Sequence, residues 1–282
     1  MITRGFVLAA AVAAMVFTFS CMSYDEGGDD PSSSSVGGGG GVSSSSGGGT
    51  SSGGGTSSSS SVRPSSSSSL LAHIGKGNDI SNYRTVVIGT QTWMAENLDY
   101  VVEGSKCYGN NPANCEKYGS LYDWSTTMGF ASSCNTSDCS SQIQSNHQGI
   151  CPSGWHIPSS DDWGKLSRYV DGTSDTFAGY NSETAGKYLK ATSGWNWNYP
   201  EDKSGNGTDE YGFSALPGGF GFSDGSFVDA GRFGRWWSAY ESENKYFSNF
   251  AYSRIMSYDS DYAYWNSLDS KSYLYSVRCL QD

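Results

Sequence analysis

The chain has 282 residues, and its 28 Asp plus Glu against 17 Lys plus Arg leave a formal net charge of −11. Nucleic-acid binding needs clustered cations, so this charge argues against a nucleic-acid partner. The 9 Trp, 19 Tyr and 12 Phe exclude a mainly disordered protein, because disordered chains are poor in large aromatic side chains.

The first 20 residues have the pattern of a signal peptide. A single cation, Arg4, precedes an apolar run from Gly5 to Ser20 that ends in small residues. The run is shorter than the roughly 18 residues that a membrane span needs. We therefore expect residues 1–20 to be removed on export rather than to remain as a spanning helix.

Ser20-Cys21 at the expected cleavage point resembles the lipobox of bacterial lipoproteins. This resemblance implies that Cys21 carries lipid. Met22 stands where an aspartate would retain a lipoprotein in the inner membrane, which favours the outer membrane and its cell-surface side. The alternative is ordinary signal cleavage that leaves Cys21 free or disulfide-bonded.

Residues 21–69 are predicted to be a tether. An acidic stretch of four carboxylates is followed, from Pro31 to about Ser69, by a segment that is almost only Ser and Gly. Such a composition cannot bury a core, so we expect a disordered coil that spans on the order of 35 Å on average. The folded domain is expected over residues 70–282.

Six cysteines follow Cys21, and an even number in an exported protein indicates disulfides. The sequence alone leaves every pairing open. Two pairs would close short loops, Cys107 with Cys115 and Cys134 with Cys139, and this leaves Cys151 with Cys279. We expect no metal, because no cysteine pair has the spacing of zinc sites and the three histidines are scattered.

Local patterns predict a hairpin and two helices. Residues 84–88 are rich in β-branched side chains, Gly89-Thr90 interrupts them and residues 91–98 continue, which predicts a β-hairpin. A helix is expected behind a Ser159 cap, and a shorter one over residues 182–190. The apolar residues at helical spacing in the first helix are Trp163, Leu166, Tyr169 and Val170.

The remaining half of the domain is expected to be loops and strands. Residues 193–233 are rich in Gly, Asn, Asp and aromatics without a regular period, so we expect irregular structure there. Residues 246–280 alternate polar and apolar side chains, which favours strands.

Four motifs together resemble the Fibrobacter succinogenes major paralogous domain family, over residues 80–282. They are Thr85-Val-Val-Ile-Gly-Thr-Gln-Thr-Trp-Met-Ala-Glu-Asn-Leu98, Gly149-Ile-Cys-Pro-Ser-Gly-Trp-His-Ile-Pro158, Tyr211-Gly-Phe-Ser-Ala-Leu-Pro-Gly218 and Ser276-Val-Arg-Cys279. More distantly, they resemble C-type lectin-like and formylglycine-generating-enzyme-like domains. The resemblance implies an α+β, C-type-lectin-like domain with two short helices, a curled antiparallel sheet, long irregular loops and close termini.

Catalytic templates are missing, so we expect no enzyme and no cofactor. The sequence contains no Gly-x-Ser-x-Gly elbow, His-Glu-x-x-His motif or phosphate loop. Cys279 alone cannot supply the paired-cysteine copper site of formylglycine-generating enzymes. Cys151 near His147 would be a nucleophile and base only if its thiol were free. A calcium loop at residues 202–210 would have Phe213 where a bidentate Glu is required, so a flexible polar loop is favoured.

Aromatic side chains among small polar ones indicate a binding surface within residues 195–229. Exposed rings can stack on sugars while neighbouring Asn and Asp bind their hydroxyls. The candidate ligand-binding residues are Trp195, Trp197, Tyr199, Asp202 and Asn206. The alternative for these rings is core packing, which is favoured for the six tryptophans in or near the motifs: Trp93, Trp124, Trp155, Trp163, Trp236 and Trp237.

These patterns lead us to expect a lipid-anchored protein of the outer membrane, exposed at the cell surface, whose non-catalytic domain binds plant polysaccharide. The alternative is a structural or adhesion protein that binds other surface proteins. An enzyme fits less well, because no set of catalytic residues is assembled.

Overall fold

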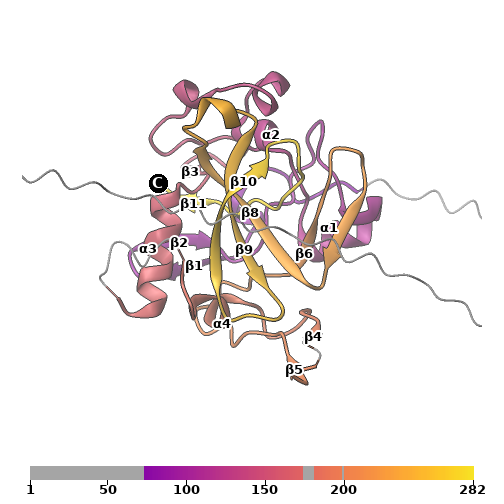
Figure 1. The fold of residues 1–282 in the computed structure, drawn as a ribbon, viewed down its shortest axis with the longest axis vertical. Coiled ribbons are helices and arrows are strands. Elements are labelled where there is room, and N and C mark those ends of the chain that lie inside the picture. The colour runs from indigo at the N-terminus through magenta and orange to yellow at the C-terminus, as the bar shows by residue number, and fades with distance from the viewer. Residues whose placement is uncertain (1–72, 174–180, 199) are drawn as a thin grey trace, which may run out of the picture. The chain divides into compact units, whose positions relative to one another are not determined.

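The computed structural model describes residues 73–173, 181–198 and 200–282. The expected signal peptide, Cys21, the tether and residues 70–72 of the expected domain lie outside these residues. The described part is an α+β fold that combines short helices with small antiparallel sheets (Figure 1). No helix within it has both the length and the apolar character needed to cross a bilayer.

The described residues contain four α-helices, two more than expected: α1 (Pro112–Tyr118), α2 (Trp124–Met128), α3 (Ser160–Asp171) and α4 (Ala185–Leu189). Short 3-10 helices lie at Ile80–Asn82, Tyr108–Asn110, Ser132–Asn135, Ser140–Gln142 and Lys245–Phe247. The helices α1 and α2 have only seven and five residues, too few to show a helical period in the sequence.

Helix α3 confirms the prediction made from Ser159. The Ser159 hydroxyl accepts a hydrogen bond from the Asp162 N–H, and the Asp162 carboxylate accepts one from the Ser159 N–H. This capping box satisfies two N–H groups that the helix itself leaves unpaired. Helix α4 confirms the second predicted helix but begins at Ala185 rather than Ser182.

The strands in the described residues are β1 (Thr85–Ile88), β2 (Gln91–Met94), β3 (Trp155–His156), β4 (Trp197–Asn198), β5 (Lys203–Ser204), β6 (Gly218–Gly221), β7 (Phe227–Ala230), β8 (Phe233–Glu241), β9 (Phe250–Ser257), β10 (Ala263–Ser270) and β11 (Leu280–Gln281). They form sheets of order β1-β2-β11-β3 and β10-β9-β8, and the two hairpins β4-β5 and β6-β7.

The first sheet joins the two ends of the domain. β1 and β2 form the predicted hairpin, in which Ile88 pairs with Gln91 across Gly89-Thr90. Gly89 has φ +62°, a conformation that glycine adopts without steric cost. The last strand, β11, pairs with both β2 and β3, so the C-terminal strand lies in the middle of the sheet that the N-terminal hairpin begins.

The second sheet, β10-β9-β8, lies at the centre of the fold, with α3 on one side of it in Figure 1 and β6 and α1 on the other. Buried aromatic residues fill the core around it. All six tryptophans for which core packing was favoured are buried: Trp93, Trp124, Trp155, Trp163, Trp236 and Trp237. The ring centroids of Trp93 and Trp163 are 4.8 Å apart, and those of Trp237 and Tyr275 are 4.4 Å apart.

Two expectations about irregular and extended segments need correction. Residues 193–233 are not irregular throughout, because they contain the hairpins β4-β5 and β6-β7. Their strands have two to four residues and many glycines, so they show no period. The alternating residues 273–279 make isolated bridges rather than a continuous strand, for example Tyr275 with Tyr122.

The two short-loop disulfides, Cys107–Cys115 and Cys134–Cys139, and the remaining pair, Cys151–Cys279, are all present. The third closes a loop of 128 residues, and its sulfur atoms are fully buried next to β11. It therefore holds the middle of the domain against its C-terminal end.

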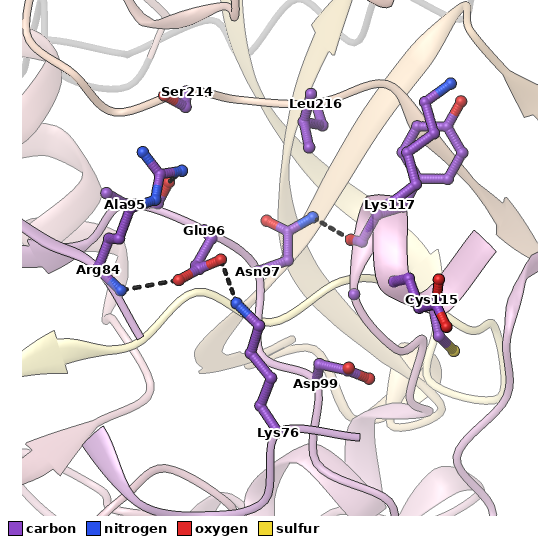
Figure 2. A pocket seen from close by; sticks show the side chains of 13 residues that line it. Lys76, Arg84, Ala95, Glu96, Asn97, Asp99, Cys115, Lys117, Ser214 and Leu216 are labelled. Atoms are coloured by element: carbon purple, nitrogen blue, oxygen red, sulfur yellow. Dashed lines mark hydrogen bonds and ion pairs between the residues drawn. The ribbon is translucent and has the colours of Figure 1, made fainter. Parts of the chain in front are cut away.

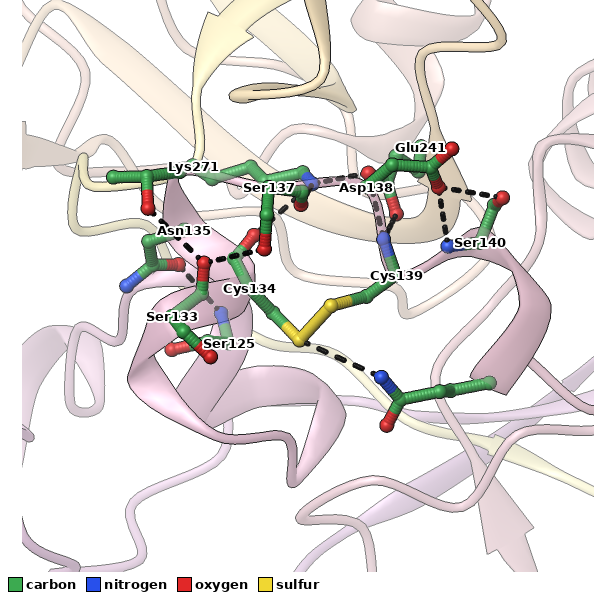
Figure 3. Close-up of a disulfide and its surroundings, with 12 residues drawn as sticks. Ser125, Ser133, Cys134, Asn135, Ser137, Asp138, Cys139, Ser140, Glu241 and Lys271 are labelled. Carbon is green, nitrogen blue, oxygen red and sulfur yellow. Dashed lines mark hydrogen bonds and ion pairs between the residues drawn. A yellow bond between two sulfur atoms is a disulfide. The ribbon is translucent and has the colours of Figure 1, made fainter. Parts of the chain in front are cut away.

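A buried ion pair attaches the Cys134–Cys139 loop to the central sheet (Figure 3). The side chains of Lys271 and Glu241 are both fully buried, and the Lys271 ammonium donates a hydrogen bond to the Glu241 carboxylate. The ammonium also donates to the carbonyl oxygens of Cys134 at 3.0 Å, Ser137 at 3.0 Å and Ser248 at 2.6 Å. Burial lowers the pKa of Lys271 and raises the pKa of Glu241, because each charged group loses its hydration.

Replacing both Cys151 and Cys279 with Ala should lower the free energy of unfolding by up to about 5 kcal/mol, because the disulfide restricts the unfolded chain over a long loop. Denaturant unfolding measures the loss. The matched control is the double replacement of Cys107 and Cys115, whose loop of eight residues predicts about half that loss. Free thiols at Cys151 and Cys279 in protein purified from the cell envelope would contradict the pairing.

Candidate functional site

Trp195, an expected ligand platform, is instead a core residue. Its side chain is only 5% exposed, and its indole Nε1–H donates to the Ala215 carbonyl at 3.0 Å. The buried Lys190 ammonium lies 5.2 Å from its ring, and burial lowers the pKa of Lys190 to about 8. The prediction that Trp195 stacks on a ligand is therefore wrong, because the ring is packed beneath the surface.

Trp197, two residues later, is 59% exposed on the β4-β5 hairpin. Its indole Nε1–H donates to the Asp202 carboxylate at 3.0 Å, so the hairpin orients the ring while leaving it accessible. Asn206 is used differently, because its side-chain oxygen accepts from the Trp195 N–H. Of the five predicted residues, Asp202 binds the exposed Trp197 ring, the half-buried Asn206 binds the backbone of Trp195, and Tyr199 lies outside the described residues.

The calcium alternative for residues 202–210 finds no support in these contacts. Three of its side chains, Asp202, Asn206 and Thr208, hydrogen-bond protein groups, and Phe213 is fully buried. Within the described ranges, one group of three side chains is close enough to bind an ion: His73, Cys107 and Cys115. Both of those cysteines are in a disulfide, so they offer no thiolate.

A cavity of about 260 Å³ lies at the tip of the β6-β7 hairpin. The rings of Phe222 and Phe227 and the side chain of Leu274 provide its apolar walls. The polar residues that line it are Lys106, Asn110, Asp123, Ser223 and Ser272. The lining thus combines two phenylalanines with five polar residues, of which Asp123 already caps α2 by accepting from the Thr126 N–H at 2.7 Å.

Neighbouring rings hold the two phenylalanines in place. The ring centroid of Phe222 lies 5.1 Å from that of Phe220 and 5.1 Å from that of Tyr273, both at steep angles. Phe227 lies 5.5 Å from Tyr108. Such edge contacts are favourable and restrict the rings, so the cavity wall is already ordered without a ligand.

The sequence interpretation assigned the binding surface to residues 195–229, which include this hairpin, but did not select Phe222 and Phe227. A local signal was present, since Asp224-Gly225 separates the two phenylalanines and is typical of a hairpin turn. The Asp224 carboxylate accepts from the Ser226 N–H at 2.9 Å, which stabilises this turn. Two phenylalanines flanking such a turn lie near each other across the hairpin.

A second, charged cavity of about 190 Å³ lies between the end of β2 and α1 (Figure 2). Glu96 accepts hydrogen bonds from the Lys76 ammonium at 2.5 Å and from the Arg84 N–H at 2.7 Å. Asp99 is bonded to His73 Nε2 at 2.7 Å. Because Glu96 and Asp99 already have protein partners, we assign this cluster a structural role at the start of the described domain.

The thiol–histidine alternative is excluded by the disulfide. Cys151 is bonded to Cys279, so it carries no free thiolate. His147 uses Nε2 in a 2.7 Å hydrogen bond with the Met128 carbonyl. Neither residue is available for nucleophilic chemistry.

The two neighbouring tryptophans should differ strongly in their effect on stability. Trp195→Ala should lower the free energy of unfolding by about 3–5 kcal/mol, because it empties a packed core position. Trp197→Ala should change it by no more than about 0.5 kcal/mol, as exposed positions usually do. Chemical denaturation of both variants measures this, and equal losses would contradict the assigned burial.

Comparison with curated proteins finds no match, and comparison with solved structures finds none either. The family model of the Fibrobacter succinogenes major domain matches residues 86–281, which include nearly all of the described structure and, except for Thr85, the four motifs. The chain therefore belongs to the Fibrobacter succinogenes major domain family.

Proposed function

We propose that this chain is a lipid-anchored protein of the outer membrane whose surface-exposed domain binds plant polysaccharide without catalysing a reaction. The observation that carries the proposal is the cavity at the β6-β7 tip, with its paired Phe222 and Phe227 rings and polar rim. Sugar rings have apolar C–H faces and hydroxyl edges, so aromatic walls beside hydroxyl, amide and charged groups suit them.

The Trp197 hairpin supplies a second exposed aromatic ring and contacts the base of the β6-β7 hairpin. The Asn196 N–H donates to the Gly231 carbonyl at 2.7 Å, which attaches the β4-β5 hairpin to the residue that follows β7. A polysaccharide is an extended ligand, so one chain could contact both the exposed Trp197 ring and the cavity. The Trp197–Asp202 pair is the type of fixed aromatic surface that such a chain requires.

The finer fold assignment, a C-type-lectin-like domain, belongs to the same proposal. It is supported by the central antiparallel sheet, by α3 next to the first hairpin and by the pairing of the last strand with the first sheet. The long segment between α4 and β8 provides both phenylalanines of the candidate cavity, as binding loops on a rigid scaffold often do.

A specific observation also favours the adhesion alternative. Tyr246 and Phe247, in the connection between β8 and β9, are 79% and 40% exposed. Nearby, the rings of Tyr240 and Tyr252 lie 4.6 Å apart. Exposed aromatic residues are enriched at protein interfaces, so this connection is where a protein partner would bind.

Retention of the purified protein on insoluble plant cell-wall polysaccharide tests the main proposal. Phe227→Ala combined with Trp197→Ala should reduce retention about tenfold or more, because stacking on each ring is lost. The matched control is Tyr246→Ala combined with Phe247→Ala, which should retain polysaccharide normally. If the Phe227 and Trp197 double variant keeps normal retention and an unchanged melting temperature, the proposed site is rejected. If the Tyr246 and Phe247 double variant loses retention and protein partners are recovered by cross-linking, the adhesion alternative is favoured.

Anchoring is tested separately at Cys21. The wild-type protein should fractionate with membranes and carry lipid on Cys21, whereas Cys21→Ala should release it into the soluble fraction, since one residue carries the anchor. Mass spectrometry of the mature N-terminus checks this prediction. An unmodified N-terminus at Cys21 would contradict it.

A further inference from the structure

A third cavity, of about 450 Å³, lies between the β1-β2 turn and α3. Its lining residues are Ile88, Gly89, Thr90, Gln91, Lys165, Arg168 and Tyr169. It therefore has two cations and no carboxylate in its lining, in a chain whose net charge is −11. The cavities at the β6-β7 tip and beside α1 both contain carboxylates.

We propose that this third cavity binds the carboxylate-bearing ring of a uronic acid, as part of an acidic polysaccharide. The inference rests on the proposed function, because it also takes the ligand to be a polysaccharide. It differs in placing the ligand outside the β6-β7 cavity and in requiring sugars that carry a carboxylate. Figure 1 shows α3 and β1 on the opposite side of the fold from β6.

Arg168 is suited to hold the carboxylate. Its side chain is 18% exposed, and its guanidinium makes one hydrogen bond within the described residues, to the Asp161 carboxylate at 3.5 Å. Asp161 is 67% exposed, so this contact is weak. The planar guanidinium offers paired N–H donors whose spacing matches the two oxygens of a carboxylate.

Tyr169 is suited to hold the sugar ring. It is 53% exposed and lies directly over Gly89, where an added Cβ would come within 2.8 Å of the phenol ring. Its ring is also packed edge-on against Tyr211, with 6.0 Å between centroids. One side of the ring is thus supported by the β1-β2 turn, and the exposed remainder offers a flat surface for stacking.

The negative charge of the whole protein does not prevent this binding. Charges farther than about 8–10 Å from the cavity are largely screened at physiological ionic strength, whereas Lys165 and Arg168 lie in its wall. Two carboxylates oppose these cations: Asp161 lies 3.0 Å and Asp162 lies 3.5 Å from the Lys165 ammonium. Asp161 competes with a ligand carboxylate for both cations.

The test measures binding of trigalacturonate to the full chain by calorimetry, beside neutral cellotriose. Arg168→Gln should weaken trigalacturonate binding about tenfold, as expected for the loss of a hydrogen bond to a charged group. Asp161→Asn should tighten it, because the competing carboxylate is removed. Tyr169→Ala should weaken it, whereas Tyr169→Phe, which keeps the ring, should bind as the wild type does. Melting temperatures of all variants establish that they are folded.

The outcomes separate this inference from the proposed function. If the wild type binds neutral sugar or cell-wall polysaccharide but not trigalacturonate, the function stands and the uronate site is overturned. If it binds neither, both proposals fail. If inorganic phosphate displaces trigalacturonate at equal concentration, or if folded Arg168→Gln binds it normally, the cavity does not recognise a uronic acid.

Discussion

The hydrogen bonds between Asn97 and Arg278 connect the segments from which the domain is built. Arg278 is fully buried, and its Nη2 donates to the Asn97 side-chain oxygen at 2.7 Å. The same oxygen accepts from the Trp236 indole at 2.8 Å, and the Asn97 amide donates to the Tyr118 carbonyl at 2.7 Å. One short side chain thus joins the segment after β2, the C-terminal segment, β8 and α1. Losing it would leave a buried indole N–H without its partner and would remove two hydrogen bonds from a buried guanidinium, which is costly.

Arg278 has no carboxylate partner within hydrogen-bond distance among the described residues, so backbone carbonyls stabilise its charge. These are the carbonyl oxygens of Met94, Phe213 and Ser214. The guanidinium also lies 4.4 Å from the centre of the Phe213 ring. Burial lowers the pKa of Arg278 to about 9, which still leaves it charged at neutral pH. The positions of these carbonyl oxygens depend on the backbone. The end of β2, residues 213–214 and the C-terminal segment must therefore fold together before the charge of Arg278 is stabilised.

This network explains why the sequence motifs predict the fold better than the ligand. Asn97, Phe213 and Arg278 each come from a different motif, and the remaining motif is joined to them by the Cys151–Cys279 disulfide. The hairpin and α3 could be predicted because their signals, Gly89-Thr90 and the Ser159 cap, are local. Which of Trp195 and Trp197 is buried could not be predicted, because their burial depends on contacts with other parts of the chain. The buried Trp195 indole donates to the Ala215 carbonyl, whereas the exposed Trp197 indole donates to the Asp202 carboxylate.

The candidate binding residues contribute little to this network, and this separation has a consequence for stability. Phe222, Phe227, Arg168 and Tyr169 lie on a hairpin tip and on the outer face of α3, where they make no hydrogen bond to Asn97 or Arg278 among the described residues. Effects of substitutions at sites without shared partners usually add independently. Substitutions of the exposed Tyr169 side chain should therefore cost little stability, whereas substitutions at Asn97 or Arg278 remove hydrogen bonds that join several segments.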